Sequence, residues 1–139
     1  MGGGIAYRQG GMLDLAAMRD LYRASTLGER RPIDDQAAFA DMLRHANLVI
    51  TAWDGELAVG IARTLTDFSY VAYLADLAVR ASHQRRGIGK ELMRRTRAAL
   101  HGRALLVLLA APKAVDYYPH VGFAHHPQAW TLKGGDPLP

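Results

Sequence analysis

The chain has 139 residues, of which half are hydrophobic and 22% are charged, as in an ordinary globular protein with one hydrophobic core. It contains no cysteine, which excludes disulfides, thiolate metal sites and a cysteine nucleophile. No apolar run approaches the roughly 20 residues of a membrane span, and no secretory-leader pattern is visible. We therefore expect a single domain over residues 1–139, loose at 1–4 and 134–139, in the cytoplasm and away from membranes.

The formal net charge is +4, and the basic residues are unevenly distributed. Residues 80–103 hold eight of the seventeen Lys and Arg, against one acid, Glu91. The cluster lacks the interleaved aromatic residues that stack on nucleobases, so a nucleic-acid partner is not expected. One anionic small molecule explains the cluster as well.

Two amphipathic helices are expected near the N-terminus. Asp14 is a suitable N-cap for a helix running through Tyr22. Asp34 or Asp35 is a suitable N-cap for a second helix running through Ala46.

A three-stranded antiparallel meander should follow the second helix. Residues 48–53 and 57–62 flank Asp54-Gly55, a dipeptide that favours a tight β-hairpin. Residues 70–79 continue the meander as a third strand, and residues 5–8 predict a short first strand at the other end of the chain.

The sequence of the last third of the chain predicts alternating helices and strands. A helix is expected over 88–100, a central strand buried on both faces over 105–110, and a short helix over 112–118. Residues 121–124 and 129–132 are expected to pair as a closing hairpin. This order of elements predicts an α/β fold with a mixed, largely antiparallel central sheet flanked by helices on both faces.

The junction between the strand and the helix at residue 88 has the features of an anion site. Gly87 and Gly89 stand where the strand–loop–helix connection ends, and the first turn of a helix has unpaired N–H groups and a dipole that favours negative charge. Taken alone, the two glycines are also compatible with a simple turn and a solvated basic face.

The spacing around these glycines resembles the coenzyme A-binding motif of the GNAT superfamily of N-acetyltransferases. The motif is Gln/Arg-x-x-Gly-x-Gly/Ala after a strand, and the dinucleotide fingerprint fits worse because a third glycine is missing. The resemblance implies that the strand pairs with the pantetheine arm and that the loop holds the pyrophosphate of acetyl-CoA. The residues it assigns to these roles are Leu77, Val79, Gln84, Arg85, Arg86, Gly87, Ile88, Gly89 and Lys90.

A second motif, Ala114 to Phe123, resembles the aromatic-Tyr-x-x-x-Gly-Phe ending of the same family. With both motifs in the right order, the chain is similar to the family along essentially its whole length. The resemblance implies a GNAT-like fold and places Tyr118 where the tyrosine protonates the departing thiolate. The alternative for Tyr118 is simple packing between helix and sheet.

The general base is less defined by the sequence. Asp76 lies in the motif strand and is a candidate to take the ammonium proton, directly or through water. A structural carboxylate is the equal alternative, and Asp67, Glu29 and Asp116 are weaker candidates. The histidines show no metal-ligand spacing, so no metal is expected.

The predicted function is direct transfer of the acetyl group of acetyl-CoA to a primary amine, carried by a small molecule or a protein. Arg30 and Arg31 are candidates to meet an acceptor carboxylate, and Tyr70, Tyr73 and Trp130 to pack against its apolar part. The alternative is an acyl-CoA-binding sensor or regulatory module that has no turnover. The sequence also leaves a homodimer open.

Overall fold

The computed structural model describes residues 4–139. The chain divides into two compact units, the first ending at Leu109 and the second running from Ala110 to Pro139, and each unit is described by itself. Residues 1–3 of the expected loose N-terminus lie outside the described residues. Residues 134–139 contain a turn and neither helix nor strand.

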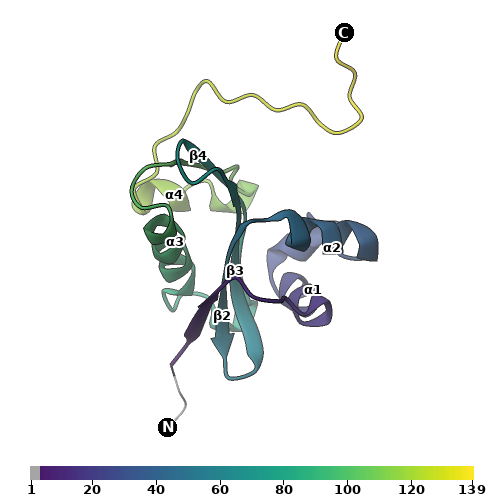
Figure 1. Cartoon of the computed structure of the whole chain (residues 1–139), viewed down its shortest axis with the longest axis vertical. Helices are drawn as coiled ribbons and strands as arrows, with labels where there is room; N and C mark the ends of the chain where they lie inside the picture. The colour runs from purple at the N-terminus through teal and green to yellow at the C-terminus, as the bar shows by residue number, and fades with distance from the viewer. Residues whose placement is uncertain (1–3) are drawn as a thin grey trace. The chain divides into compact units, whose positions relative to one another are not determined.

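The first unit is built on one open sheet of five strands in sequence order (Figure 1). β1 (Ala6–Gln9), β2 (Leu48–Asp54), β3 (Leu57–Thr66) and β4 (Val71–Val79) pair as antiparallel neighbours. β5 (Leu105–Val107) lies parallel to β4. The predicted mixed, largely antiparallel sheet is confirmed, and so is the hairpin between β2 and β3.

Two helices on one face of the sheet begin at the predicted caps. α1 (Leu15–Arg23) starts after Asp14, and α2 (Gln36–His45) starts after Asp35. Each carboxylate accepts a hydrogen bond from the N–H group three residues on, at 3.0 and 3.1 Å. Between them lies the short 3₁₀ helix η1 (Thr26–Glu29).

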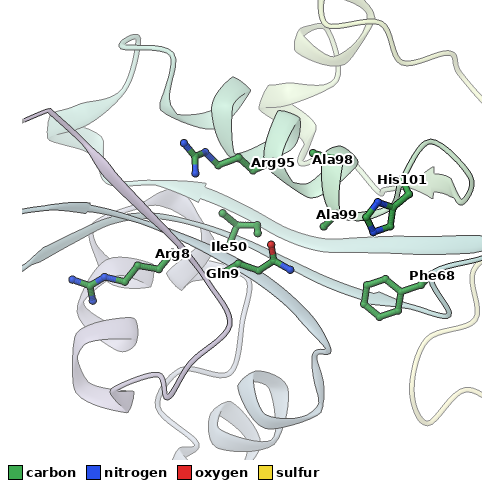
Figure 2. Close-up of a pocket in the computed structure, with 8 residues that line it drawn as sticks. All are labelled: Arg8, Gln9, Ile50, Phe68, Arg95, Ala98, Ala99 and His101. Atoms are coloured by element: carbon green, nitrogen blue, oxygen red, sulfur yellow. The ribbon is translucent and has the colours of Figure 1, made fainter.

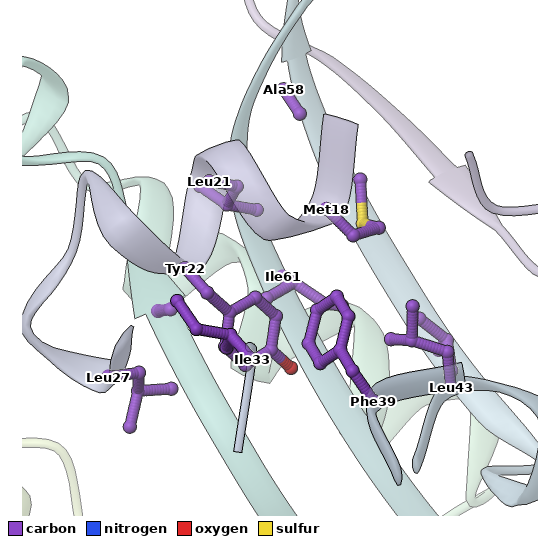
Figure 3. Close-up of a cluster of buried hydrophobic side chains, with 11 residues drawn as sticks. Met18, Leu21, Tyr22, Leu27, Ile33, Phe39, Leu43, Ala58 and Ile61 are labelled. Carbon is purple, nitrogen blue, oxygen red and sulfur yellow. The ribbon is translucent and has the colours of Figure 1, made fainter. Parts of the chain in front are cut away.

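The main core fills the space between these helices and the sheet (Figure 3). Tyr22 of α1 and Phe39 of α2 meet edge to face, with ring centroids 5.0 Å apart, and both are fully buried. Ile61 of β3 and Val49 of β2 line the sheet side of the same cluster. The core therefore fixes the α1–α2 segment against the middle of the sheet.

α3 (Ile88–Ala99) covers the opposite face of the sheet (Figure 1). Gly60 of β3 allows its close approach, because a Cβ atom there would lie 2.9 Å from Leu92 Cδ1 and 3.1 Å from Ile88 Cγ2. The predicted helices on both faces are thus confirmed.

β5 differs from the expected central strand. It has only three residues and is the last strand of the sheet formed by residues 4–109, and Leu105 is 59% exposed. The prediction of a strand buried on both faces is wrong, since apolar composition alone cannot distinguish a central strand from the edge of an open sheet.

The second unit contains the 3₁₀ helix η3 (Pro112–Ala114) and the four-residue helix α4 (Tyr117–His120). The predicted closing hairpin is wrong, because residues 121–132 form turns and extended chain with no strand. Gly122 has a φ of 96° and donates its N–H to the Pro119 carbonyl, so it ends α4 and does not continue a strand. Trp130, in the expected second strand, is 91% exposed.

Among residues 4–139, no helix is both long enough and apolar enough to cross a membrane.

Candidate active site

β4 is free along one edge over its second half. Its parallel pairing with β5 begins at Val71–Leu105 and ends at Tyr73–Val107. Within residues 4–109, no strand pairs with β4 beyond Tyr73 on that side. The backbone groups along this part of the edge are therefore available to another extended chain.

Leu77 and Val79 are the residues whose backbone groups face the free edge. The N–H of Arg80 donates to the Val59 carbonyl at 2.8 Å, on the β3 side. Because backbone groups alternate between the two edges of a strand, those of Val79 and Leu77 point away from β3. The Val79 carbonyl does accept the side-chain amide of Gln84 from that direction, at 3.1 Å.

The N-terminus of α3 lies directly after this strand and loop. Gly87 is its N-cap, with a φ of 80° that favours glycine, and no side chain caps the helix. The first intrahelical bond runs from the Glu91 N–H to the Gly87 carbonyl at 3.0 Å. The N–H groups of residues 88–90 thus have no partner within the helix and can bind an anion.

The loop before α3 is basic and exposed. Gln84, Arg85, Arg86 and Gly87 are all exposed, as is Lys90 in the first turn. Within residues 4–139, Arg85, Arg86 and Lys90 take part in no ion pair, whereas Arg94 and Arg95 both pair with Glu91. The cations beside the helix start are therefore those that remain available to a ligand.

The backbone of the same loop is strained, as is common at ligand sites. Arg85 has a φ of 63°, which is unusual for a residue with a side chain. Such conformations cost about 1–3 kcal/mol and cluster at ligand sites. The loop residues and the free strand edge, which the sequence assigned to one cofactor, lie together in the first unit.

Asp76 is buried at the centre of an ion network. Its side chain is inaccessible, and Oδ2 accepts hydrogen bonds from the Tyr22 hydroxyl and Arg63 Nε, both at 2.6 Å. Oδ1 accepts one from Arg31 Nε, also at 2.6 Å. These contacts join α1, the α1–α2 segment and β3 to one residue of β4.

The ionisation of this network is shifted accordingly. Burial raises the pKa of Asp76, but the hydrogen bond and charge of Arg63, with help from Tyr22 and Arg31, outweigh burial and lower the pKa below its usual value. Burial, and then the neighbouring carboxylate, hold the pKa of Tyr22 well above its usual value, so its hydroxyl stays a donor. An inaccessible carboxylate that accepts three hydrogen bonds and has a lowered pKa is a poor base. The structure thus argues against Asp76 as the general base and favours its structural alternative.

A β-bulge accompanies the network. Arg63 pairs with Asp76, but the next residue, Thr64, pairs with Leu74, so Ala75 is an extra residue in β4. The Ala75 carbonyl accepts a hydrogen bond from Arg31 Nη2 at 2.9 Å. Because the Arg31 guanidinium is committed to Asp76 and Ala75, the expected role of Arg31 in binding an acceptor carboxylate is not supported.

The other acceptor candidates of the first unit are exposed. Arg30 and Tyr70 are exposed, and Tyr73 is about half as exposed as Tyr70. Tyr73 pairs with Leu65 across the sheet, and Leu65 lies on the same face of β3 as Arg63. Leu65 and Tyr73 therefore form an exposed apolar strip on the sheet face that carries the Asp76 network.

Tyr118 lies in α4 of the second unit. Its ring packs edge to face against Tyr117 and Phe123, at 5.3 and 5.4 Å between centroids. Burial, and to a lesser degree Tyr117, raise the pKa of the Tyr118 hydroxyl. The phenol is therefore protonated at neutral pH, as a general acid must be.

Comparison with known proteins identifies the family. Residues 15–123 match the family model described as the acetyltransferase (GNAT) family. The chain belongs to the GNAT family. It is also 32% identical over 71 residues to an uncharacterized N-acetyltransferase of Gracilaria tenuistipitata var. liui; the aligned region is 50% of this chain and 39% of that protein.

Solved structures share the GNAT fold along nearly the whole chain. An acetyltransferase of the GNAT family from Streptococcus pneumoniae aligns with a TM-score of 0.72 and 25% identity, over 94% of this chain and 99% of the other. A probable acetyltransferase from Staphylococcus aureus gives 0.78 at 18% identity, over 94% and 98%. An aminoglycoside N-acetyltransferase in complex with coenzyme A gives 0.74 at 18% identity, over 98% of each chain, a likeness of fold alone.

A hollow of about 460 Å³ lies away from the N-terminus of α3 (Figure 2). It is lined by Gln9 and Ile50 of the sheet, by Phe68, and by the last turn of α3 and His101 beyond it. The uncapped N-terminus lies at the other end of α3, a helix of 12 residues and therefore about 18 Å long. The hollow is therefore remote from the loop residues that the sequence resemblance assigns to the cofactor.

The partners of Asp76 were not evident from the sequence. Tyr22 lies in the first expected helix, and Arg63 lies directly after the strand expected over residues 57–62. Alternation along β3 carried the signal for Arg63: it stands on the same face as Ile61, so a charged residue occupies a core-facing position. Such a position requires a buried partner of opposite charge.

Replacing Asp76 with Asn should destabilise the protein strongly. Two guanidinium groups would remain at a buried site without their counter-charge, which costs about 3–5 kcal/mol. Urea unfolding measures the loss. Asp41→Asn is the matched control, because Asp41 pairs with Arg44 at the surface and its loss should cost under about 1 kcal/mol.

The pH dependence follows from the lowered pKa of Asp76. Its stabilising contribution is complete above the unfolded pKa of about 4 and is lost as the pH falls through the lower folded pKa. The Asp76→Asn variant should lack this loss of stability at acidic pH. If instead the variant unfolds like wild type but loses turnover, Asp76 acts as the general base.

Proposed function

We propose that the protein is an N-acetyltransferase that moves the acetyl group of acetyl-CoA directly to a primary amine. One observation carries the proposal: a free strand edge runs within a few residues into a basic loop and an uncapped helix N-terminus. An extended amide-bearing arm fits the first feature, and a pyrophosphate fits the second. Coenzyme A carries both groups in one molecule.

The residues divide between these two parts of the cofactor. The backbone of Leu77 and Val79 pairs with the pantetheine arm along the free edge of β4. The pyrophosphate lies at the N–H groups of Ile88, Gly89 and Lys90, and the side chains of Gln84, Arg85, Arg86 and Lys90 surround it. Gly87 and Gly89 permit close approach of the phosphate to the backbone.

The reaction requires no covalent enzyme intermediate. The neutral amine nitrogen attacks the thioester carbonyl carbon, the C–S bond breaks, and Tyr118 donates its proton to the departing sulfur. The proton lost by the amine passes to water, since the Asp76 side chain is inaccessible and already accepts three hydrogen bonds. The chain has no cysteine to carry the acetyl group.

The acceptor belongs to the class of primary amines on small molecules or proteins. The exposed strip at Leu65 and Tyr73 supports an acceptor with an apolar part beside its amine. Cytoplasmic location and a homodimer remain predictions.

Acetyl-CoA should raise the melting temperature of the protein. A ligand at 100 times its Kd stabilises the folded state by about 2.7 kcal/mol. Gly89→Asp should lose this response, because its carboxylate would repel the pyrophosphate at the helix start. Gly134→Asp, at an open position in the second unit, is the control and should respond as wild type does. An unchanged wild-type melting temperature at millimolar acetyl-CoA would contradict the proposal.

Tyr118→Phe should lower kcat about 100-fold and leave acetyl-CoA affinity nearly unchanged, because the hydroxyl acts only as the thiolate departs. Steady-state kinetics and calorimetry measure the two quantities. The neighbouring Tyr117→Phe is the matched control and should retain kcat within about twofold. Equal kcat values for Tyr118→Phe and wild type would make Tyr118 a packing residue.

A further inference from the structure

The loop that precedes α3 is tied to distant parts of the first unit before it becomes exposed. The Arg80 guanidinium contacts Asp20 of α1 at 2.7 Å, and the Ala81 N–H donates to the Ala24 carbonyl at 2.8 Å. The next residue with a buried side chain is His83, which is 9% exposed and belongs to the 3₁₀ helix η2 (Ala81–His83). After it, residues 84–87 are exposed up to the start of α3.

Both nitrogens of the His83 ring have partners. Nε2 lies 2.9 Å from Asp54 Oδ2, and Nδ1 lies 2.7 Å from Ser82 Oγ. An ionised carboxylate only accepts hydrogen bonds, so Nε2 carries a proton and donates it to Asp54. In the neutral ring, Nδ1 then accepts from the Ser82 hydroxyl. The ring is therefore held in one orientation.

Asp54 is the last residue of β2, directly before the β2–β3 turn. It is 29 residues from His83 in sequence, and its side chain is partly exposed. The hydrogen bond thus attaches the loop to the end of the β2–β3 hairpin, in addition to the attachment to α1 by sequence neighbours of His83. Asp54 lies outside residues 84–90, the loop and helix start that resemble the coenzyme A-binding motif.

We propose that His83 and Asp54 form a positioning pair that fixes the loop so that the free N–H groups of α3 and the loop cations meet the cofactor phosphates. His83 is the last buried attachment before the four exposed loop residues. Without it, those residues must be ordered when the ligand binds, and this ordering weakens binding. The inference rests on the proposed function, because it assigns the phosphates of coenzyme A to this loop.

The residue types Ser82, His83 and Asp54 are also those of a serine-nucleophile triad. Here Ser82 contacts the ring of the next residue in the chain, His83. That ring is buried and connects the loop before α3 to the end of β2. The three side chains belong to the loop support, and the direct attack proposed above uses none of them.

Calorimetric titration with coenzyme A tests the pair. His83→Ala and Asp54→Ala should each raise the Kd about tenfold, as expected for losing a hydrogen bond to a charged group. The double variant should bind no more weakly than either single variant, because the two residues act as one unit. His83→Gln, whose amide can still donate to Asp54, should recover most of the affinity.

Asp54→Ala keeps the test valid if His83→Ala does not fold, since the Asp54 side chain is partly exposed and its removal opens no buried cavity. Asp41→Ala, at the surface ion pair of α2, is the control and should keep wild-type affinity. Wild-type Kd values in the Ala variants would overturn the positioning role alone. The positioning role would also be overturned if the losses of affinity of the two single variants added in the double variant. A loss of affinity in His83→Gln as large as in His83→Ala would overturn it too. Failure of the wild type to bind coenzyme A would overturn the proposed function and this inference together.

Discussion

The buried carboxylate of Asp76 is the interaction on which the arrangement of the site depends. Side-chain face and backbone edge alternate together along a strand, so fixing one side chain fixes the direction of the neighbouring backbone groups. Tyr22, Arg31 and Arg63 hold Asp76 on the α1 face of β4. The backbone of Leu77 and Val79 must then face the free edge. A shift of one residue would turn these groups toward β3.

The same carboxylate holds the segment between α1 and α2 against the sheet. Arg31 belongs to the segment between α1 and α2, and its guanidinium joins that segment to Asp76 and to the bulge at Ala75. Two cations around one anion leave a net positive charge. This charge disfavours an ammonium group close to the network and therefore favours the neutral form of an amine that approaches it.

Close packing places the uncapped N-terminal end of α3. Gly60 allows Ile88 and Leu92 to approach β3, and Ile88 is the first residue of the helix. The position of the uncapped N-terminus is therefore set by a strand residue at the centre of the sheet. The loop before α3 is attached to α1 through Arg80 and Ala81, and to Asp54 at the β2–β3 turn through His83.

Local signals made much of this structure predictable. Asp14 and Asp35 cap their helices, Asp54-Gly55 marks the hairpin, and Gly87 begins α3, because each depends on chemistry within a few residues. The sequence left the role of Asp76 open between a general base and a structural carboxylate, since its partners Tyr22 and Arg31 lie 54 and 45 residues away. β5 was misjudged for the same reason: whether an apolar strand is central depends on a neighbouring strand, which its own residues do not encode.

The reaction proposed for this protein is direct transfer of an acetyl group from acetyl-CoA to an amine. The most direct measurement is release of free thiol from acetyl-CoA in the presence of a panel of primary amines, with initial rates at varied concentrations of both substrates. We expect amine-dependent release, rising with pH as the amine loses its proton, and intersecting double-reciprocal lines. Parallel lines would contradict direct transfer, and binding of acetyl-CoA without thiol release to any amine would indicate a sensor on the GNAT fold.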